Sequence, residues 1–182
     1  MPPELHSPPS PQHTFFNRPW WAVGQPLDGQ GGLRINETAT RARAGLLNVI
    51  SAMTLGVLLT RPEWDPVLYV GPFVLLDMLL AASTGLTPLS PTGVLGTALT
   101  MRMRPTWKAT TPKRFAWGLG ATLAAVCLGM RGLGATPGAM AVVVAVCFAL
   151  TWLEATLGFC VGCWLHARIW GCEVCDVPYV RP

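Results

Sequence analysis

Four long apolar runs restrict the fold of this 182-residue sequence more than any other feature. A helix needs about 20 mostly apolar residues to cross the hydrocarbon core of a bilayer, and each run is near that length. The third is marginal and needs flanking residues to span, with a tilted or re-entrant segment as the alternative. We therefore predict an all-α, integral membrane four-helix bundle. The runs cover residues 44–60, 66–86, 115–131 and 138–163.

The composition agrees with a membrane environment. Hydrophobic residues make up 51% of the sequence and charged residues 12%, whereas about 25% of the residues of soluble proteins are charged. The Lys and Arg residues lie at the edges of the apolar runs and form no separate basic patch. We therefore expect the lipid bilayer as a partner and no nucleic acid.

The segments outside the four runs divide the rest of the chain. Residues 1–27 are rich in proline and are predicted to be a disordered tail. The membrane domain covers 28–170, and 171–182 form a C-terminal tail. The short connection at 61–65 predicts an antiparallel hairpin of the first two spans.

Apolar residues recur at helical spacing between the second and third runs. This pattern predicts a short amphipathic helix in the membrane interface, with a partly ordered loop as the alternative. The apolar residues are Val94, Leu95, Ala98, Leu99 and Met103.

Lys and Arg are divided unequally between the two sides of the predicted bundle. Only Arg61 and Arg131 lie in the loops of one side. By the positive-inside rule the other side is cytoplasmic, and it carries both termini. That side has Arg34, Arg41, Arg43, Arg102, Arg104, Lys108, Lys113, Arg114, Arg168 and Arg181.

Two CxxC pairs form the densest cluster of reactive side chains. Cys160 and Cys163 make the first pair, Cys172 and Cys175 the second, and His166 lies between them. Paired cysteines at this spacing are typical of dithiol redox proteins and of metal sites. A third reading, reduced structural cysteines, explains scattered residues better than spaced pairs.

The redox reading treats each pair as a dithiol that cycles with a disulfide or handles sulfur. Thiolate is the reactive form, and a helix amino terminus favours it. The fourth run places the first pair at a helix carboxyl end, where the dipole disfavours negative charge. Reactivity there would need the positive charge of Arg168 or of protonated His166. A helix break at Gly158 or Gly162 would be another way to obtain it.

The metal reading uses the same side chains as ligands. Four thiolates, or three with His166, would form a tetrahedral zinc site. The two pairs are eight residues apart, which is less than the ~15–20 residues usual in zinc ribbons. Zinc is therefore the cofactor of the alternative reading only.

Asp77 and Glu154 are acids inside the second and fourth runs. A charge in a span is costly, so each is a candidate functional residue, for proton transfer or for transport. We prefer the interpretation that each pairs with Arg43, Arg114 or another cation at the cytoplasmic edge and fixes helix packing.

Four stretches carry a resemblance: INETATRARA from Ile35, the acid of the second span followed by Ser90-Pro91, PKRFAWGLG from Pro112 and LEATLGFCVGC from Leu153. Over residues 28–170 the chain resembles a bacterial membrane family called domain of unknown function 4395. The resemblance implies a location in the bacterial inner membrane and no particular activity. Cys172 and Cys175 lie outside the shared pattern. The hallmark positions that it implies are Arg41, Asp77, Lys113, Arg114, Phe115, Glu154, Cys160 and Cys163.

Together these patterns lead us to expect a membrane-embedded dithiol protein that performs thiol–disulfide or sulfur-transfer chemistry at the cytoplasmic membrane face. Its partner would be a cytoplasmic thiol or sulfur-carrier protein, or a larger membrane complex. The alternative is a non-enzymatic accessory subunit with a zinc-binding cysteine cluster. The reactive groups are Cys160, Cys163, Cys172 and Cys175, joined by His166 in the zinc alternative.

Overall fold

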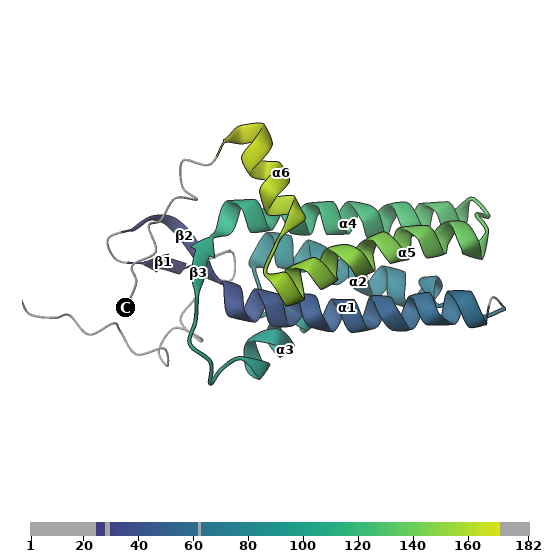
Figure 1. Cartoon of the computed structure of the whole chain (residues 1–182), viewed down its shortest axis with the longest axis horizontal. Helices are drawn as coiled ribbons and strands as arrows, with labels where there is room; N and C mark the ends of the chain where they lie inside the picture. The colour runs from purple at the N-terminus through teal and green to yellow at the C-terminus, as the bar shows by residue number, and fades with distance from the viewer. Residues whose placement is uncertain (1–24, 28–29, 62, 172–182) are drawn as a thin grey trace, which may run out of the picture.

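The computed structural model describes residues 25–27, 30–61 and 63–171, and its main feature is a bundle of four long helices. Each is long and apolar enough to cross a membrane, which confirms the predicted all-α membrane bundle. Figure 1 shows the helices side by side along the long axis. They are α1 (Glu37–Thr60), α2 (Val67–Thr84), α4 (Thr110–Gly132) and α5 (Pro137–Trp152), the last continued by a π-helical turn, η2 (Leu153–Leu157).

The ends of the helices differ from the predicted ends. Helix α1 begins at Glu37 rather than at 44, because the side chain of Asn36 accepts hydrogen bonds from the N–H groups of Thr38 and Ala39 and caps the helix. Helix α4 begins at Thr110 rather than at 115. With 23 residues, the third span is no longer marginal in length.

The helices pack in two antiparallel pairs, α1 with α5 and α2 with α4. Asn48 of α1 donates hydrogen bonds to the Phe148 carbonyl (2.8 Å) and the Thr151 hydroxyl (3.1 Å) of α5. Helices α1 and α2 follow each other in the chain but contact each other at few positions. The predicted hairpin is therefore a connection along the chain and not a packed pair.

A short helix, α3 (Pro91–Leu99), lies between α2 and α4 in the sequence, as predicted. It packs against α1 so closely that a Cβ atom on Gly96 would lie 2.8 Å from the backbone nitrogen of Arg43. Small residues allow such contacts between helices in membranes. The interfacial position of α3 stays a prediction.

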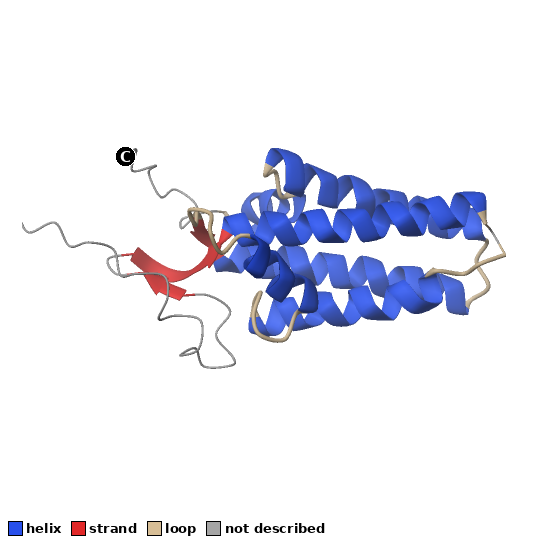
Figure 2. Ribbon diagram, turned by 90° about the horizontal axis from the view of Figure 1, so that it is seen from below, coloured by secondary structure: helices blue, strands red, loops and turns tan. Residues whose placement is uncertain are grey.

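A small antiparallel sheet lies at one end of the bundle and was not expected from the sequence. It consists of β1 (Gln25–Leu27), β2 (Gln30–Asn36) and β3 (Trp107–Ala109), in the order β1-β2-β3. Strand β1 takes residues from the segment predicted to be a disordered tail. Strand β2 leads into α1 and β3 into α4, so pairing of Asn36 with Trp107 fixes the starts of the two helices together. Figure 2 shows the strands at the end that we call the site end.

Candidate functional site

The helix of the fourth span is interrupted at the site end. The π-helical turn η2 is followed by Gly158, whose φ of 67° is in the left-handed region that ends many helices. The N–H groups of Gly158 and Phe159 bond back to the carbonyls of Glu154 (3.1 Å) and Leu153 (3.2 Å). π-Helical turns are rare and are found frequently at functional sites.

A new helix, α6 (Val161–Trp170), starts directly after the break, and Cys160 is its N-cap residue. The Cys160 sulfur accepts a hydrogen bond from the N–H of Cys163, at 3.4 Å. The prediction that this pair lies at a helix carboxyl end is therefore wrong, because the fourth helix stops at Leu157 instead of continuing to 163. The thiols lie in the first turn of a helix, where the dipole favours negative charge.

Helix α6 is held against the start of α4. A Cβ atom on Gly162 would lie 2.6 Å from the Ala116 Cβ, so glycine is needed for this approach. Next to it, the rings of Phe115, His166 and Trp170 pack with centroids 5.1–5.6 Å apart. The orientation of the CxxC turn therefore depends on α4.

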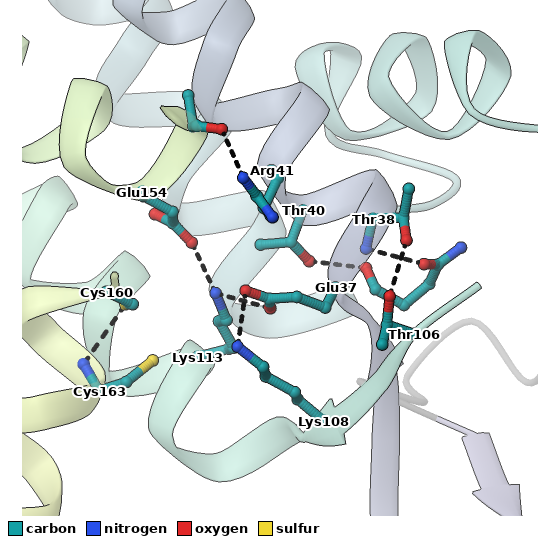
Figure 3. Close-up of polar contacts among 12 residues, drawn as sticks. Glu37, Thr38, Thr40, Arg41, Thr106, Lys108, Lys113, Glu154, Cys160 and Cys163 are labelled. Carbon is teal, nitrogen blue, oxygen red and sulfur yellow. Dashed lines mark hydrogen bonds and ion pairs between the residues drawn. The ribbon is translucent and has the colours of Figure 1, made fainter. Parts of the chain in front are cut away.

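Lys113, in the first turns of α4, lies between two acids from other helices. Its ammonium is 2.6 Å from Glu154 Oε1 and 2.9 Å from Glu37 Oε2, and its side chain is 2% exposed. The exposed Lys108 reaches Glu37 from the other side, at 3.2 Å. We call Glu37, Lys108, Lys113 and Glu154 the charge cluster. Figure 3 shows it beside Cys160 and Cys163.

Arg41 links α1 to the segment where the fourth helix ends. Its guanidinium donates hydrogen bonds to the carbonyls of Ala155 (3.2 Å) and Thr156 (2.8 Å). These are among the last carbonyls of the helix, which lack partners within it and attract positive charge. A Cβ atom on Gly158 would lie 3.3 Å from this guanidinium, so Arg41 and Gly158 together fix where the turn to Cys160 begins.

The two thiols of the first pair differ in acidity. The pKa of Cys160 is lowered, chiefly because the Cys163 thiol donates a hydrogen bond to it, with Lys113 and the Cys163 N–H adding to the effect against burial and Glu154. The pKa of Cys163 is raised well above its usual range, by donating that bond and by burial. Because the thiolate is the nucleophile, Cys160 is the attacking residue of the pair.

We expect iodoacetamide to modify Cys160 faster than Cys163, with a half-maximal rate at a pH below 9.0, the ordinary pKa of a thiol. Peptide mass spectrometry of the purified protein with Cys172 and Cys175 replaced by serine would measure both rates against pH. Cys163→Ala is the matched variant, since alanine has no side-chain donor; it removes the bond that chiefly lowers the Cys160 pKa and should shift the profile to higher pH. Equal rates at the two cysteines would contradict the assignment.

The other intramembrane acid, Asp77, lies in a separate buried network. Its carboxylate pairs with Arg43 at 2.7 Å, and both side chains are almost fully buried. It also accepts hydrogen bonds from the Ser90 hydroxyl (2.8 Å) and from the N–H (3.0 Å) and hydroxyl (2.5 Å) of Thr92. Asp77 thus holds α1, α2 and the start of α3 together.

The structure brings together some of the predicted site residues and not others. Cys160, Cys163 and Glu154 lie beside one another around Lys113, whereas Asp77 belongs to the Arg43 network. Cys172 and Cys175 lie outside the described residues, so the second pair stays a prediction. Within 25–27, 30–61 and 63–171, no three His, Cys, Asp or Glu side chains converge as metal ligands would. The zinc alternative, which needs the second pair, also stays a prediction.

Glu37 is the site residue that the sequence reasoning missed. It is the first residue of α1 and is 4% exposed. Asn36 as a helix cap followed by an acid in the first turn is a recognisable helix start. That signal would have extended the first helix to Glu37, though not to its contact with Lys113.

Comparison with known proteins gives one family. A family model described as a domain of unknown function (DUF4395) matches residues 35–170. No curated protein and no solved structure matches the chain.

Proposed function

The chain belongs to the DUF4395 family, and from its site geometry we propose that it is a membrane dithiol protein that exchanges electrons with a partner through Cys160 and Cys163. The main observation behind this proposal is that Cys160 caps α6 and accepts a hydrogen bond from the N–H of Cys163. A cysteine at a helix amino terminus, followed three residues later by a second, is the arrangement in which one thiol is activated and the other resolves.

The reaction that this arrangement supports is thiol–disulfide exchange. The Cys160 thiolate attacks one sulfur of a partner disulfide, and the other partner sulfur leaves as a thiolate. The Cys163 thiol then loses its proton and attacks Cys160 in the mixed disulfide. The partner leaves with both electrons as a dithiol, and Cys160 and Cys163 are joined as a disulfide. The same steps run in reverse when the partner is the reductant.

The charge cluster acts on the Cys160 thiol with two opposite effects. The carboxylate of Glu154 raises the Cys160 pKa, and the ammonium of Lys113 offsets part of that effect. Glu37 and Glu154 both pair with Lys113 and hold its ammonium in place. The lowered Cys160 pKa therefore depends chiefly on the hydrogen bond from the Cys163 thiol.

We further propose that the site end faces the cytoplasm of a bacterial cell, where the partner is a thiol protein. Nine of the described Lys and Arg residues lie at the site end. They are found before α1, between α2 and α4, after α5, or in the first turns of α1 and α4. Arg61 and Arg131 lie at the opposite end. The positive-inside rule then orients the bundle. The predicted second pair, Cys172 and Cys175, would relay electrons between this partner and Cys160.

Trapping of thiols in intact cells tests the proposal. We expect a maleimide reagent to find the Cys160–Cys163 pair oxidised in a fraction of molecules, and that fraction to rise under oxidant stress and fall on recovery. Cys163→Ser should accumulate a mixed disulfide with the partner, visible as a reductant-sensitive adduct.

Cys147→Ser is the matched control, since Cys147 lies within α5 and is not part of the CxxC turn. This variant should give no adduct and leave the oxidised fraction unchanged. A CxxC pair that stays reduced through oxidant stress would overturn the proposal, as would equal adducts in the two variants.

A further inference from the structure

An elongated cavity lies inside the bundle, between the α1/α5 pair and the α2/α4 pair. Its volume is about 320 Å³, and residues of all four long helices line it. On α1 it extends from Thr40 to Thr54, which corresponds to about 21 Å along the helix axis. The volume falls within the ~300–1,000 Å³ common for small-molecule sites.

The chemistry of the cavity wall changes along its length. Most of the wall is aliphatic, for example Leu47, Val74 and Val144, whereas Arg43 and Glu154 line it near the site end. Arg43 is 2% exposed, and among the described residues its Nε–H has no acceptor. Buried donors normally find a partner. The cavity therefore fits a molecule with a long apolar body and a head group that accepts a hydrogen bond.

The cavity also reaches the proposed reactive residue. Cys160 and its neighbours Val161 and Gly162 form part of the wall. A head group at the Arg43 end thus lies in the same space as the thiol that attacks. An occupant of the cavity can therefore exchange electrons with Cys160 directly, without a protein partner.

We propose that the cavity binds a membrane quinone, which accepts the electrons of the Cys160–Cys163 dithiol. A quinone has carbonyl oxygens to accept a hydrogen bond from Arg43, a ring and tail that suit an aliphatic wall, and the capacity for two electrons. This inference rests on the proposed dithiol function. It also sets the direction of electron flow, from a partner dithiol through Cys160 and Cys163 to the quinone.

The step balances in atoms and electrons. The Cys160 and Cys163 thiols lose two electrons and two protons and become joined by an S–S bond. The quinone gains both electrons and both protons, one at each carbonyl oxygen, and leaves as a quinol. A partner dithiol then reduces the disulfide by exchange and becomes a disulfide itself.

Binding and reduction of a ubiquinone with a ten-carbon tail test the inference on purified full-length protein in detergent. We expect saturable quenching of tryptophan fluorescence by the quinone, and one quinol formed per Cys160–Cys163 disulfide after prior reduction and removal of the reductant. Cys163→Ser should still bind the quinone and form no such disulfide.

Two neighbouring alanines of α4 give a matched pair for the cavity. Ala124 lines it and is buried, whereas Ala125 is exposed and lies outside the wall. Ala124→Phe should weaken quinone binding by about tenfold or more, the equivalent of ~1.4 kcal/mol. Ala125→Phe should bind as the unchanged protein does.

The possible results separate this inference from the dithiol proposal. Absent or non-saturable binding, equal binding by the two phenylalanine variants, or a tightly held phospholipid that the quinone does not displace would overturn the cavity assignment and leave the dithiol proposal standing. Binding without oxidation of the thiols would overturn the electron-transfer step. Oxidation of the pair in cells only through a protein adduct would do the same.

Discussion

Replacing Lys113 with methionine is expected to lower the free energy of unfolding by about 3–5 kcal/mol, because it leaves buried charges without their partner. The Lys113 side chain is 2% exposed and pairs with both Glu37 and Glu154, which are themselves 5% and 16% exposed. Methionine fills a similar volume but provides no charge. Unfolding by urea in detergent micelles, followed by tryptophan fluorescence, would measure the loss.

Lys108→Met is the matched control, since Lys108 reaches the same Glu37 with a side chain that is 53% exposed. An exposed ion pair contributes about 1 kcal/mol or less, so this variant should unfold nearly as the unchanged protein does. Lys113→Met should also raise the pKa of Cys160 and slow its alkylation, which Lys108→Met should not. Equal stability of the two variants would mean that the buried pairs contribute nothing beyond exposed ones.

The second large effect is expected for Asp77→Asn, which keeps the shape of the side chain and removes its charge. The Arg43 guanidinium would then be buried without a counterion, at a cost of about 3–5 kcal/mol. Asparagine can still accept a hydrogen bond from Thr92, but the start of α3 would be held less firmly. Hydrogen exchange of residues 91–99 should therefore accelerate along with the loss of global stability.

The control for Asp77 is Asp65→Asn at the opposite end, where Asp65 pairs with Arg131 and both are partly exposed. That substitution should change the unfolding free energy by about 1 kcal/mol or less. The double variant Arg43→Met with Asp77→Leu should be more stable than Asp77→Asn, because it leaves no buried charge of this pair unmatched. A double variant less stable than the single one would show that the network contributes more than charge balance.

The four spans could be predicted because the thickness of the bilayer sets the length of an apolar run. The pairing of α1 with α5 and α2 with α4 could not, since lipid and helix surfaces are equally apolar and the choice depends on contacts such as that of Asn48 with α5. The sheet was missed for a related reason. Strand β3 has only three residues, too few for an alternating pattern, and it forms because β2 lies beside it.

The candidate site was predicted in its residues but not in its geometry. The spacing of Cys160 and Cys163 identified the pair, and Gly158 was recognised as a possible break. Extending the apolar run placed the thiols at the wrong helix end, although glycine after the last helical turn is a common stop signal. The meeting of Glu37 with Lys113 joins residues far apart in the sequence, and no local pattern encodes it.

The pairing of the helices has a consequence for how the protein is made. Each packed pair joins one helix from the first half of the chain with one from the second, so the halves are interleaved and neither contains a finished unit. Glu37, Lys113 and Glu154 likewise come from the first, third and fourth spans. During synthesis the first spans are inserted into the membrane before the helices that pack against them, and α1 remains without its partner until α5 is inserted. The thiol of Cys160 therefore gains Lys113 and Glu37 as neighbours only when the fourth span has packed against the others, and before that point its pKa is not lowered by Lys113.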